Sequence, residues 1–470
     1  MSALGLLYLL SRIIAIGAII HVVLDNRQPS KTMAWALVIY FIPLFGVIAY
    51  IFFGVNRRKE KFVSHRSMDM LTKRSMLEFV EQRQLDLPSD FQSLIGLFIE
   101  QSFSLPFINR KTDILTSGYD FFPRLLADIA QARSHIHIDM YIFEDDALGR
   151  LISDALIDKV RQGVEVRVIY DDVGCWAVKN RFFERMRQEG IDVEPFMPVR
   201  FPQFTSKANY RNHRKIIVID GHVGYTGGMN LALRYVKGRG NQPWRDTMMR
   251  IEGGGVNGLQ RAFLVDWYFV DRTLLSDRKY YTKPETEGAL MQTVTSGPVA
   301  TYPEIMQGYL RIIMAAKKYL YFQTPYFLPT DSVLFAMKTA AASGVDVRLM
   351  VPRHSDAYFV EWASRSYLRE AAEAGIKVSL YEGGFLHAKT LVSDDAVGTC
   401  GSTNLDFRSF ENNFEGNAFF YDSNLARRMR DVYLADEQQS VDLTTLSDRM
   451  NPHIVRRLWD SLTRLLSPLL

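Results

Sequence analysis

Cysteine is scarce in this chain, and its scarcity excludes a protein built on disulfides. The 470 residues include only Cys175 and Cys400, whereas disulfide scaffolds are short chains dense in cysteine. Two reduced cysteines suit a reducing compartment. Cys400 directly precedes the pair Gly401–Ser402, so we predict that it is a small packed side chain rather than a catalytic thiol.

An excess of charge of either sign is also missing. The formal net charge is +4 over 470 residues, so the composition gives no indication of a nucleic-acid-binding surface. The sequence has no cluster of His, Asp and Glu with the spacing of metal ligands. We therefore expect no metal ion, no other cofactor and no nucleic-acid partner.

The N-terminal segment is nearly free of charge, which predicts a membrane module over residues 1–55. Residues 33–53 contain no charged side chain and are numerous enough to span a bilayer as a helix with a kink at Pro43. Residues 2–24 are mostly apolar but include Arg12. That Arg suits a tilted span, or a re-entrant or interfacial helix, better than a cleaved signal peptide. We expect a transmembrane helical hairpin and therefore a multi-pass membrane protein.

Basic residues are distributed unevenly around these two stretches. The loop between them, residues 25–32, has two, whereas the segment after the second stretch has seven: Arg57, Arg58, Lys59, Lys61, Arg66, Lys73 and Arg74. Because cytoplasmic flanks of membrane helices carry the excess of Lys and Arg, the remainder of the chain is predicted to face the cytoplasm. Residues 56–110 are charged and helix-prone, and we predict that they form a connector.

The chain carries one spaced set of residues twice. The first copy is His213, Lys215, Asp220, Gly227, Gly228 and Asn230, and the second is His387, Lys389, Asp394, Gly401, Ser402 and Asn404. The intervals between successive members are the same in both copies. This agreement indicates two structural repeats that each contribute to one site.

The spacing has a physical interpretation. Residues 216–219 and 390–393 are typical of buried β-strands, and residues two apart on a strand point to the same side. Each His therefore shares a space with its Lys, whereas each Asp lies at the strand's end and is predicted to anchor the turn. The glycines permit close approach of the returning backbone, which brings each Asn amide to the pocket as a phosphate ligand. Two imidazoles, two ammonium groups and two amides suit a phosphodiester, which needs a nucleophile, an acid and donors to its charged oxygens.

The same order of elements precedes both copies. A strand, a helix closed by glycine and another strand come first in each half, and the strands are residues 135–143 and 164–170, then 319–322 and 345–351. This β-α-β-α-β order predicts an α/β fold with a sheet sandwich in each half. We place the repeats at residues 111–285 and 286–470, where the pattern breaks.

These residues resemble the paired His-Lys-Asp signature of the phospholipase D superfamily. The resemblance implies two phospholipase D-like repeats facing one active site. It implies that one His attacks phosphorus to form a phosphohistidine, and that the other protonates the leaving alcohol and then activates the incoming one. Superfamily precedent favours His213 as the nucleophile. An acid that supports each catalytic His is also implied, and Asp246 and Glu415 stand at suitable places downstream of His213 and His387.

The N-terminal module narrows the resemblance. It is similar to the module that precedes the catalytic region of bacterial cardiolipin synthases, and the similarity rests on Arg27, Pro29, Thr32, Ala34, Trp35, Pro43, Gly46, Tyr50, Phe53 and Gly54. The resemblance implies an inner-membrane cardiolipin synthase that transfers a phosphatidyl group between two phosphatidylglycerol molecules and releases glycerol. The motifs leave open whether the second lipid is phosphatidylglycerol or phosphatidylethanolamine, and they give no oligomeric state.

Three alternatives share parts of this pattern. A membrane-bound phospholipase D that hydrolyses phospholipid would use the same active-site residues. A nuclease of the superfamily is disfavoured by the N-terminal module and the weak net charge, and a scaffold with a decayed site is disfavoured by two complete motifs.

Two further segments have alternative interpretations. Residues 198–212, which have no counterpart in the second half, are basic and aromatic. They are predicted either to bind anionic lipid headgroups at the mouth of the site or to form a solvated loop. Residues 453–470 are amphipathic, and we favour a last helix docked on the core over a helix lying on a membrane.

Overall fold

The structure, a computed structural model, describes most of the chain in two units. The described residues are 3–25, 29–54, 87–199, 209–238, 240, 243–283, 285–298, 300 and 302–467. One unit comprises residues 1–61 with 199–210, and the other comprises residues 62–198 with 211–470. The basic segment at 57–74, much of the predicted connector and most of the 198–212 segment lie outside the described residues.

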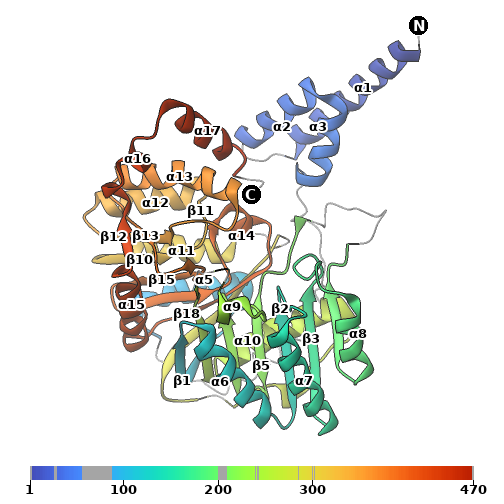
Figure 1. Ribbon diagram of the computed structural model, residues 1–470, viewed down its shortest axis with the longest axis vertical. Helices are drawn as coiled ribbons and strands as arrows, with labels where there is room; N and C mark the ends of the chain where they lie inside the picture. Colours follow the sequence, from blue (N-terminus) through green and yellow to red (C-terminus); the bar gives the residue numbers. More distant parts are fainter. Residues whose placement is uncertain are drawn as a thin grey trace. The chain divides into compact units, whose positions relative to one another are not determined.

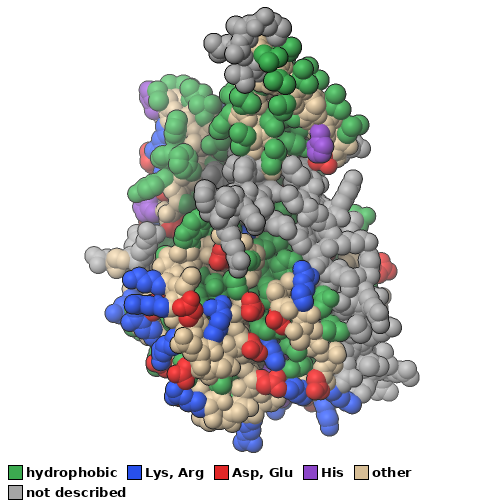
Figure 2. Space-filling view, turned by 90° about the vertical axis from the view of Figure 1, so that its right-hand side faces the viewer, with side chains coloured by type: hydrophobic (Ala, Val, Ile, Leu, Met, Phe, Trp, Pro, Cys, Tyr) green, Lys and Arg blue, Asp and Glu red, His purple; other side chains and the backbone are tan. Residues whose placement is uncertain are grey.

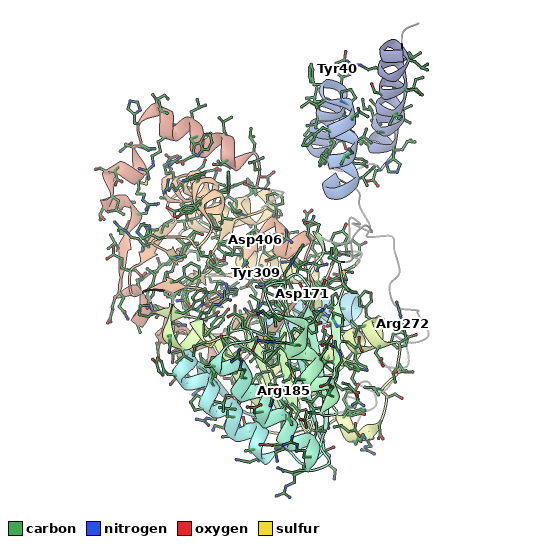
Figure 3. All side chains as sticks on the ribbon, turned by 45° about the vertical axis from the view of Figure 1, so that its right-hand side comes forward. Tyr40, Asp171, Arg185, Arg272, Tyr309 and Asp406 are labelled. Atoms are coloured by element: carbon green, nitrogen blue, oxygen red, sulfur yellow. The ribbon has the colours of Figure 1, made fainter. Side chains whose placement is uncertain are left out.

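The N-terminal unit is a group of helices, blue in Figure 1. The elements are α1 (Ala3–Leu24), α2 (Pro29–Phe41), α3 (Pro43–Ala49) and a π-helical turn η1 (Tyr50–Gly54). Ala15, Val22, Ile39 and Tyr50 form their small common core. Arg12 donates to the backbone oxygen of Tyr40 at 2.9 Å, which gives the cation within apolar α1 a partner. Tyr40 is labelled in Figure 3.

The predicted span over residues 33–53 is broken rather than merely kinked. Proline has no N–H and its ring collides with the preceding turn, so α2 ends at Phe41 and α3 begins at Pro43. No helix in the described ranges combines the length and the apolar character needed to cross a membrane. The hydrophobic stretches nevertheless pack against each other as a helical hairpin through the core just named.

The large unit is built on one sheet of fifteen strands. The strands of the first repeat are β1 (Pro106–Leu115), β2 (His135–Met140), β3 (Glu165–Asp171), β4 (Asp192–Phe196), β5 (Lys215–Ile219), β6 (Val223–Gly227) and β8 (Met248–Gly253). Those of the second are β9 (Ala289–Ser296), β10 (Tyr319–Gln323), β12 (Asp346–Pro352), β13 (Lys377–Tyr381), β15 (Thr390–Ser393), β16 (Val397–Gly401), β18 (Glu415–Phe420) and β19 (Ser440–Asp442).

A single antiparallel seam joins the two halves of this sheet. At the seam β1 pairs with β9, and Phe107 lies opposite Met291. Outward from the seam the order is β8-β6-β5-β2-β3-β4 on one side and β18-β16-β15-β10-β12-β13-β19 on the other. The mixed α/β fold and its duplication are as predicted. The separate sheet expected in each half is not found, because the first strand of each repeat stands at its sheet edge and pairs with the other.

Helices cover the sheet and close a core in each repeat. The first repeat has α6 (Gly118–Gln131), α7 (Ala147–Arg161), α8 (Asn180–Gln188), α9 (Arg234–Lys237) and α10 (Val256–Asp271). The second has α11 (Glu304–Ala315), α12 (Asp331–Ala342), α13 (Tyr358–Glu373), α14 (Phe407–Glu411), α15 (Ser423–Glu437), α16 (Ser447–Met450) and α17 (Ile454–Arg464). Figure 1 shows the first repeat in teal to yellow-green and the second in yellow to red, side by side.

Helix α5 (Gln92–Ser102) precedes the first repeat in the chain but packs against the second repeat. It comes directly before β1. Its Leu94, Ile95 and Phe98 pack into the core of the second repeat, so the two halves are interlocked at the seam.

The remaining elements are short. They are the strands β7 (Trp244–Arg245), β11 (Phe327–Leu328), β14 (Phe385–Leu386) and β17 (Leu405–Asp406), and the 3-10 turns η2 (Ser89–Phe91), η4 (Arg278–Tyr280) and η5 (Leu443–Thr445). The pairing of β7 with β14 joins the first repeat to the second.

Candidate active site

Each motif His is held by the backbone of the other repeat. The N–H of His213 donates to the carbonyl of Phe414 at 2.9 Å, and the N–H of His387 donates to the carbonyl of Arg245 at 2.7 Å. Phe414 and Arg245 directly precede Glu415 and Asp246. The two repeats therefore exchange equivalent backbone contacts, and each contact sets a carboxylate beside a His.

The carboxylates are crossed between the repeats. His213 Nδ1 lies 3.1 Å from both oxygens of Glu415, and His387 Nδ1 lies 2.7 Å from Asp246 Oδ2. Each acid is fully buried. A carboxylate at Nδ1 fixes the proton on that nitrogen and leaves Nε2 as the basic nitrogen. The sequence located both acids, but counting from the His of the same repeat did not reveal that each serves the other one.

Asp246 and Glu415 have different neighbours. This difference explains why the first motif has glycine at position 228 where the second has serine at position 402. A Cβ at position 228 would lie 2.0 Å from Asp246 Oδ1, so only glycine leaves room for that carboxylate. In the second repeat Ser402 Oγ donates to Glu415, and Asn413 Nδ2 donates to it at 3.2 Å. Burial opposes ionisation of Glu415, but the neighbouring His213, Lys215 and these donors hold its pKa below the ordinary value.

The lysines lie beside the histidines, as their i and i+2 spacing predicts. Lys215 Nζ donates to the His213 carbonyl at 2.6 Å, and Lys389 Nζ donates to the His387 carbonyl. Burial lowers the pKa of Lys215 to about 7 and that of Lys389 to about 8, with Glu415 and Asp246 opposing the change. The two carboxylates only partly offset the cost of burying these ammonium groups. A bound anion would therefore stabilise their charged forms.

Burial also lowers the pKa of both imidazoles to about 4. The lysines of both copies reinforce this change, and the crossed carboxylates oppose it. Lys389 lowers the pKa of His213, and Lys215 lowers that of His387. The four side chains therefore lie close enough to share one site. Near neutral pH the site therefore holds neutral imidazoles, of which one is available as a nucleophile.

The motif aspartates anchor turns at the far end of the strands. Asp220 accepts the backbone N–H groups of residues 133, 134 and 135 at 2.8 to 2.9 Å. Asp394 accepts those of residues 317, 318 and 319 at 2.7 to 2.9 Å. Both have positive φ, 53° and 55°, a conformation that Asp tolerates better than most residues. The aspartates thus tie each His strand to its neighbour rather than to the reacting groups.

The two motif asparagines differ in their contacts. Asn230 Oδ1 accepts from the N–H of Ile142 at 3.1 Å, and its Nδ2 donates to Tyr235 Oη at 2.6 Å, so this amide is engaged within its own repeat. Asn404 hydrogen-bonds the side chain of Asp406, and its buried Oδ1 has no hydrogen-bond partner among the described residues. That either amide binds phosphate stays a prediction.

A buried ion pair behind His213 was not predicted. Arg214, between His213 and Lys215, donates to the Glu415 carbonyl at 3.0 Å and to the Asp266 carboxylate. The second copy has Ala388 at the corresponding position. A charged residue within a buried strand and an acid on the apolar helix α10 were the only sequence signals for this pair. It fixes the backbone of Glu415 and so positions the acid that serves His213.

The end of strand β3 and two aromatic rings complete the surroundings of the two histidines. Asp171, labelled in Figure 3, ends β3 and accepts the N–H of Asn212 at 2.8 Å, directly before His213. The ring of Tyr141 lies 4.8 Å from that of His213, and the ring of Trp244 lies 5.5 Å from that of His387. These rings contribute to the burial that lowers the pKa of each imidazole.

The structure also bears on the cysteines and on groups of side chains that could bind a metal ion. Both cysteines are buried and unpaired, and burial raises the pKa of Cys175 to about 12 and raises that of Cys400 as well. Neither is therefore a thiolate at neutral pH. Across the described ranges, no group of three or more His, Cys, Asp or Glu side chains is arranged to hold a metal ion.

Comparison with protein families agrees with this geometry. The family described as "Cardiolipin synthase, PLD-like domain" matches residues 125–251 and 309–436, once in each repeat. The family described as "Phospholipase_D-nuclease N-terminal" matches residues 13–54. A duplicated His-Lys site on this fold, together with these matches, defines a phospholipase D-like protein, as the motifs predicted.

Similar proteins of known function show which family within the phospholipase D-like class this chain belongs to. The chain is 39% identical to a cardiolipin synthase of Oceanobacillus iheyensis, over 99% of this chain and 98% of that one. It is 38% identical to the major cardiolipin synthase ClsA of Bacillus subtilis, over 96% of both chains. The chain belongs to the cardiolipin synthase family. A crystal structure of phosphatidylserine synthase from Haemophilus influenzae shares the fold, with a TM-score of 0.64 at 16% identity over 81% of this chain and 99% of that one.

Proposed function

We propose that this protein is a cardiolipin synthase that joins two phosphatidylglycerol molecules and releases glycerol. The observation that carries the proposal is the crossed arrangement, in which each His has a carboxylate from the other repeat and a Lys from its own. This arrangement supplies two imidazoles with defined tautomers and two cations around one space. Family membership adds the lipid substrate class.

In the first step His213 attacks phosphorus. With its Nδ1 proton held by Glu415, Nε2 of His213 forms a bond to the phosphorus of phosphatidylglycerol. The bond between phosphorus and the glycerol oxygen breaks as glycerol leaves. His387, which takes up a proton at Nε2 when the phosphodiester anion binds beside it, delivers that proton to the glycerol oxygen. Lys215 and Lys389 neutralise the charged phosphoryl oxygens as they approach the transition state.

In the second step the phosphatidyl group leaves His213. A hydroxyl of a second phosphatidylglycerol gives its proton to His387, and its oxygen bonds to phosphorus while the bond from phosphorus to nitrogen breaks. Asp246 stabilises the imidazolium that forms at His387. Both histidines return to their starting states, and the products are one cardiolipin and one glycerol.

Product analysis tests this function. Full-length protein given phosphatidylglycerol labelled in its glycerol headgroup is expected to release one labelled glycerol for each cardiolipin formed. The expected ratio follows from transfer to a lipid hydroxyl rather than to water. Phosphatidic acid as the main product would identify a hydrolase and contradict the proposal. Adding phosphatidylethanolamine to the same assay distinguishes the second lipid substrate.

The pH dependence of kcat/KM is expected to reflect the buried lysines. Because their pKa values are lowered to about 7 and about 8, both are charged at lower pH and lose a proton as the pH rises through those values. The ability to bind a phosphodiester anion should fall with them. We therefore expect kcat/KM to decline as the pH rises above about 7, and more steeply above about 8.

A matched variant separates this effect from loss of stability. Lys389→Arg keeps its charge at all relevant pH values, so its kcat/KM, although lower near pH 7 because the larger group fits poorly, should lose the decline that belongs to Lys389. A wild-type profile that stays level to about pH 10 would contradict the assignment of the lysines.

We also propose that the N-terminal hairpin holds the enzyme on the membrane with its catalytic unit in the cytoplasm. Apolar side chains on α1 are exposed in the structure, including Ile13 at 58% and Ile16 at 59%, which suits contact with lipid. The excess of basic residues after residue 55 supports the orientation.

A further inference from the structure

The last helix of the chain has its polar and apolar sides reversed. A helix on the surface of a globular protein normally turns its apolar side to the core. In α17 (Ile454–Arg464) and the turn after it, the polar residues Asp460, Thr463 and Ser467 are buried, at 0%, 3% and 1% exposure. The large apolar side chains face outward, and they are Ile454, Val455, Leu458, Trp459, Leu462 and Leu465, exposed by 48% to 75%.

Ion pairs fix the helix in this orientation on α13. Arg369 Nη1 donates to Asp460 at 2.8 Å in a buried pair. Arg464 lies 2.7 Å from Glu370 and its guanidinium lies 3.9 Å from the centre of the Tyr367 ring. The helix thus docks on the core, as the sequence favoured, but through its polar side. These pairs hold the apolar side away from the protein.

The apolar side continues onto the beginning of α13. Trp459 lies 5.6 Å from Trp362, which lies 5.3 Å from Phe359. Tyr358 and Phe359 are exposed by 75% and 53%. We call these aromatic residues and the outward side chains of α17 the terminal apolar face. Its helical part forms a shallow hollow, lined by His453, Val455, Arg456, Leu458, Trp459 and Leu462.

The exposed charges on α17 itself are basic, and an acid outside the helix, Asp448 on α16, lies 3.9 Å from Arg456. Arg457 and His453 are exposed beside the outward side chains, and the single acidic residue between 453 and 467 is the buried Asp460. A second copy of the chain on the same face would bring Arg457 near its own counterpart with no exposed acid from this helix to pair with. A bilayer with anionic headgroups matches both the apolar side chains and the basic edge.

A chain of contacts links this face to the active site. Tyr326 Oη donates to Asp356 at 2.7 Å, and Asp356 stands two residues before Tyr358 in the chain. The ring of Tyr326 lies 6.4 Å from that of His387. An apolar surface seated in lipid at Tyr358 would therefore lie within a few residues of the groups beside His387. On the side that Figure 2 shows, basic and acidic side chains are interspersed on the lower part of the molecule.

We propose that the terminal apolar face inserts into the headgroup region of an anionic bilayer and delivers lipid to the site beside His387. This is a second membrane contact, separate from the N-terminal hairpin. Its inserted part is the side of α17 that carries Leu458 and Leu462, and its polar side remains bonded to α13.

Spin labels in the full-length protein test the insertion directly. Leu458→Cys and Leu462→Cys are labelled in separate variants and reconstituted in vesicles of phosphatidylglycerol and phosphatidylethanolamine. The native cysteines are buried and compete poorly for the label. Oxygen, which concentrates in the bilayer, should relax these labels more than a water-soluble nickel chelate does. Leu151→Cys on α7, exposed by 51%, is the matched control and should show the reverse.

Two results of this measurement would overturn the proposal. Nickel access at 458 and 462 equal to that at 151 would show that water covers the face. Exclusion of both reagents would show that protein covers it, as in an association of two copies. Because no turnover is measured, these results do not depend on the proposed function.

An activity ratio tests lipid delivery, and this second measurement rests on the proposed function. The variant Leu458→Glu with Leu462→Glu is compared with Leu151→Glu, on phosphatidylglycerol in bilayers and on a short-chain form dissolved as monomers. The ratio of bilayer to monomer activity should fall about tenfold or more in the double variant, since two Leu side chains no longer insert, and stay unchanged in the control. An unchanged ratio in the double variant contradicts delivery, whereas absence of wild-type activity on both substrates contradicts the proposed function alone.

Discussion

His213→Asn is expected to abolish turnover together with the covalent intermediate, whereas His387→Asn abolishes turnover but still permits slow labelling of His213. The nucleophile must form a bond to phosphorus, and asparagine cannot do so. The acid only moves a proton, so a substrate with a good leaving group bypasses it. We expect kcat on phosphatidylglycerol to fall by about 10³-fold or more in both variants.

The measurement uses a phosphatidyl ester of p-nitrophenol, followed by rapid quenching in denaturant at neutral pH, where the bond from phosphorus to nitrogen survives, and mass spectrometry of the labelled peptide. His222→Asn is the matched control, because His222 contacts Arg110 and Thr282 rather than the site, and it should turn over normally. Label on His387 in the His213 variant, with none on His213 in the His387 variant, would reverse the two roles.

Exchanging the crossed acids for amides is expected to separate the two chemical steps. Glu415→Gln should reproduce the defect of His213→Asn, because Glu415 holds the Nδ1 proton of His213. Asp246→Asn should reproduce the defect of His387→Asn, since Asp246 serves that imidazole. An amide in place of such a carboxylate disturbs the tautomer and no longer stabilises the imidazolium, and we expect losses in kcat of about 10²- to 10⁴-fold.

The same activated ester distinguishes crossed from uncrossed pairing. Labelling of His213 should be strongly reduced in Glu415→Gln and retained in Asp246→Asn. Pairing within each repeat predicts the opposite pattern, so retained labelling in Glu415→Gln with loss in Asp246→Asn would show that the crossed contacts do not act in catalysis. Asp266→Asn offers a comparison, since its effect on His213 passes through Arg214 and should be smaller.

The strands, the duplication and the motif side chains were predictable because they depend on local spacing. Lys215 lies near His213 since a strand repeats every two residues, and Asp220 anchors a turn because it ends the strand. Family resemblance added the acids. These features follow from the chain within each repeat, and the structure places them accordingly.

What escaped prediction depends on contacts between distant segments. The crossed pairing of Glu415 with His213 requires knowing how the repeats face each other, which no spacing within one repeat contains. The pairing of β1 with β9 likewise joins strands from different repeats, so the pattern within one repeat does not reveal it. Arg214 looked like a variable position between two motif residues, and its role emerged only with Asp266 on α10. The break at Pro43 was expected as a kink, because its effect depends on what supports the turn before it.

The crossed contacts have a consequence for biosynthesis. A ribosome completes the first repeat, with His213, Lys215 and Asp246, before any of the second has emerged. The acid for His213 is Glu415, and β1 waits for β9 as its sheet neighbour. A nascent or prematurely terminated chain thus holds the proposed nucleophile without its carboxylate and without the second imidazole. Under the proposed mechanism such fragments cannot attack the phospholipids around them, so the reactive centre forms only after Glu415 of the second repeat has been made.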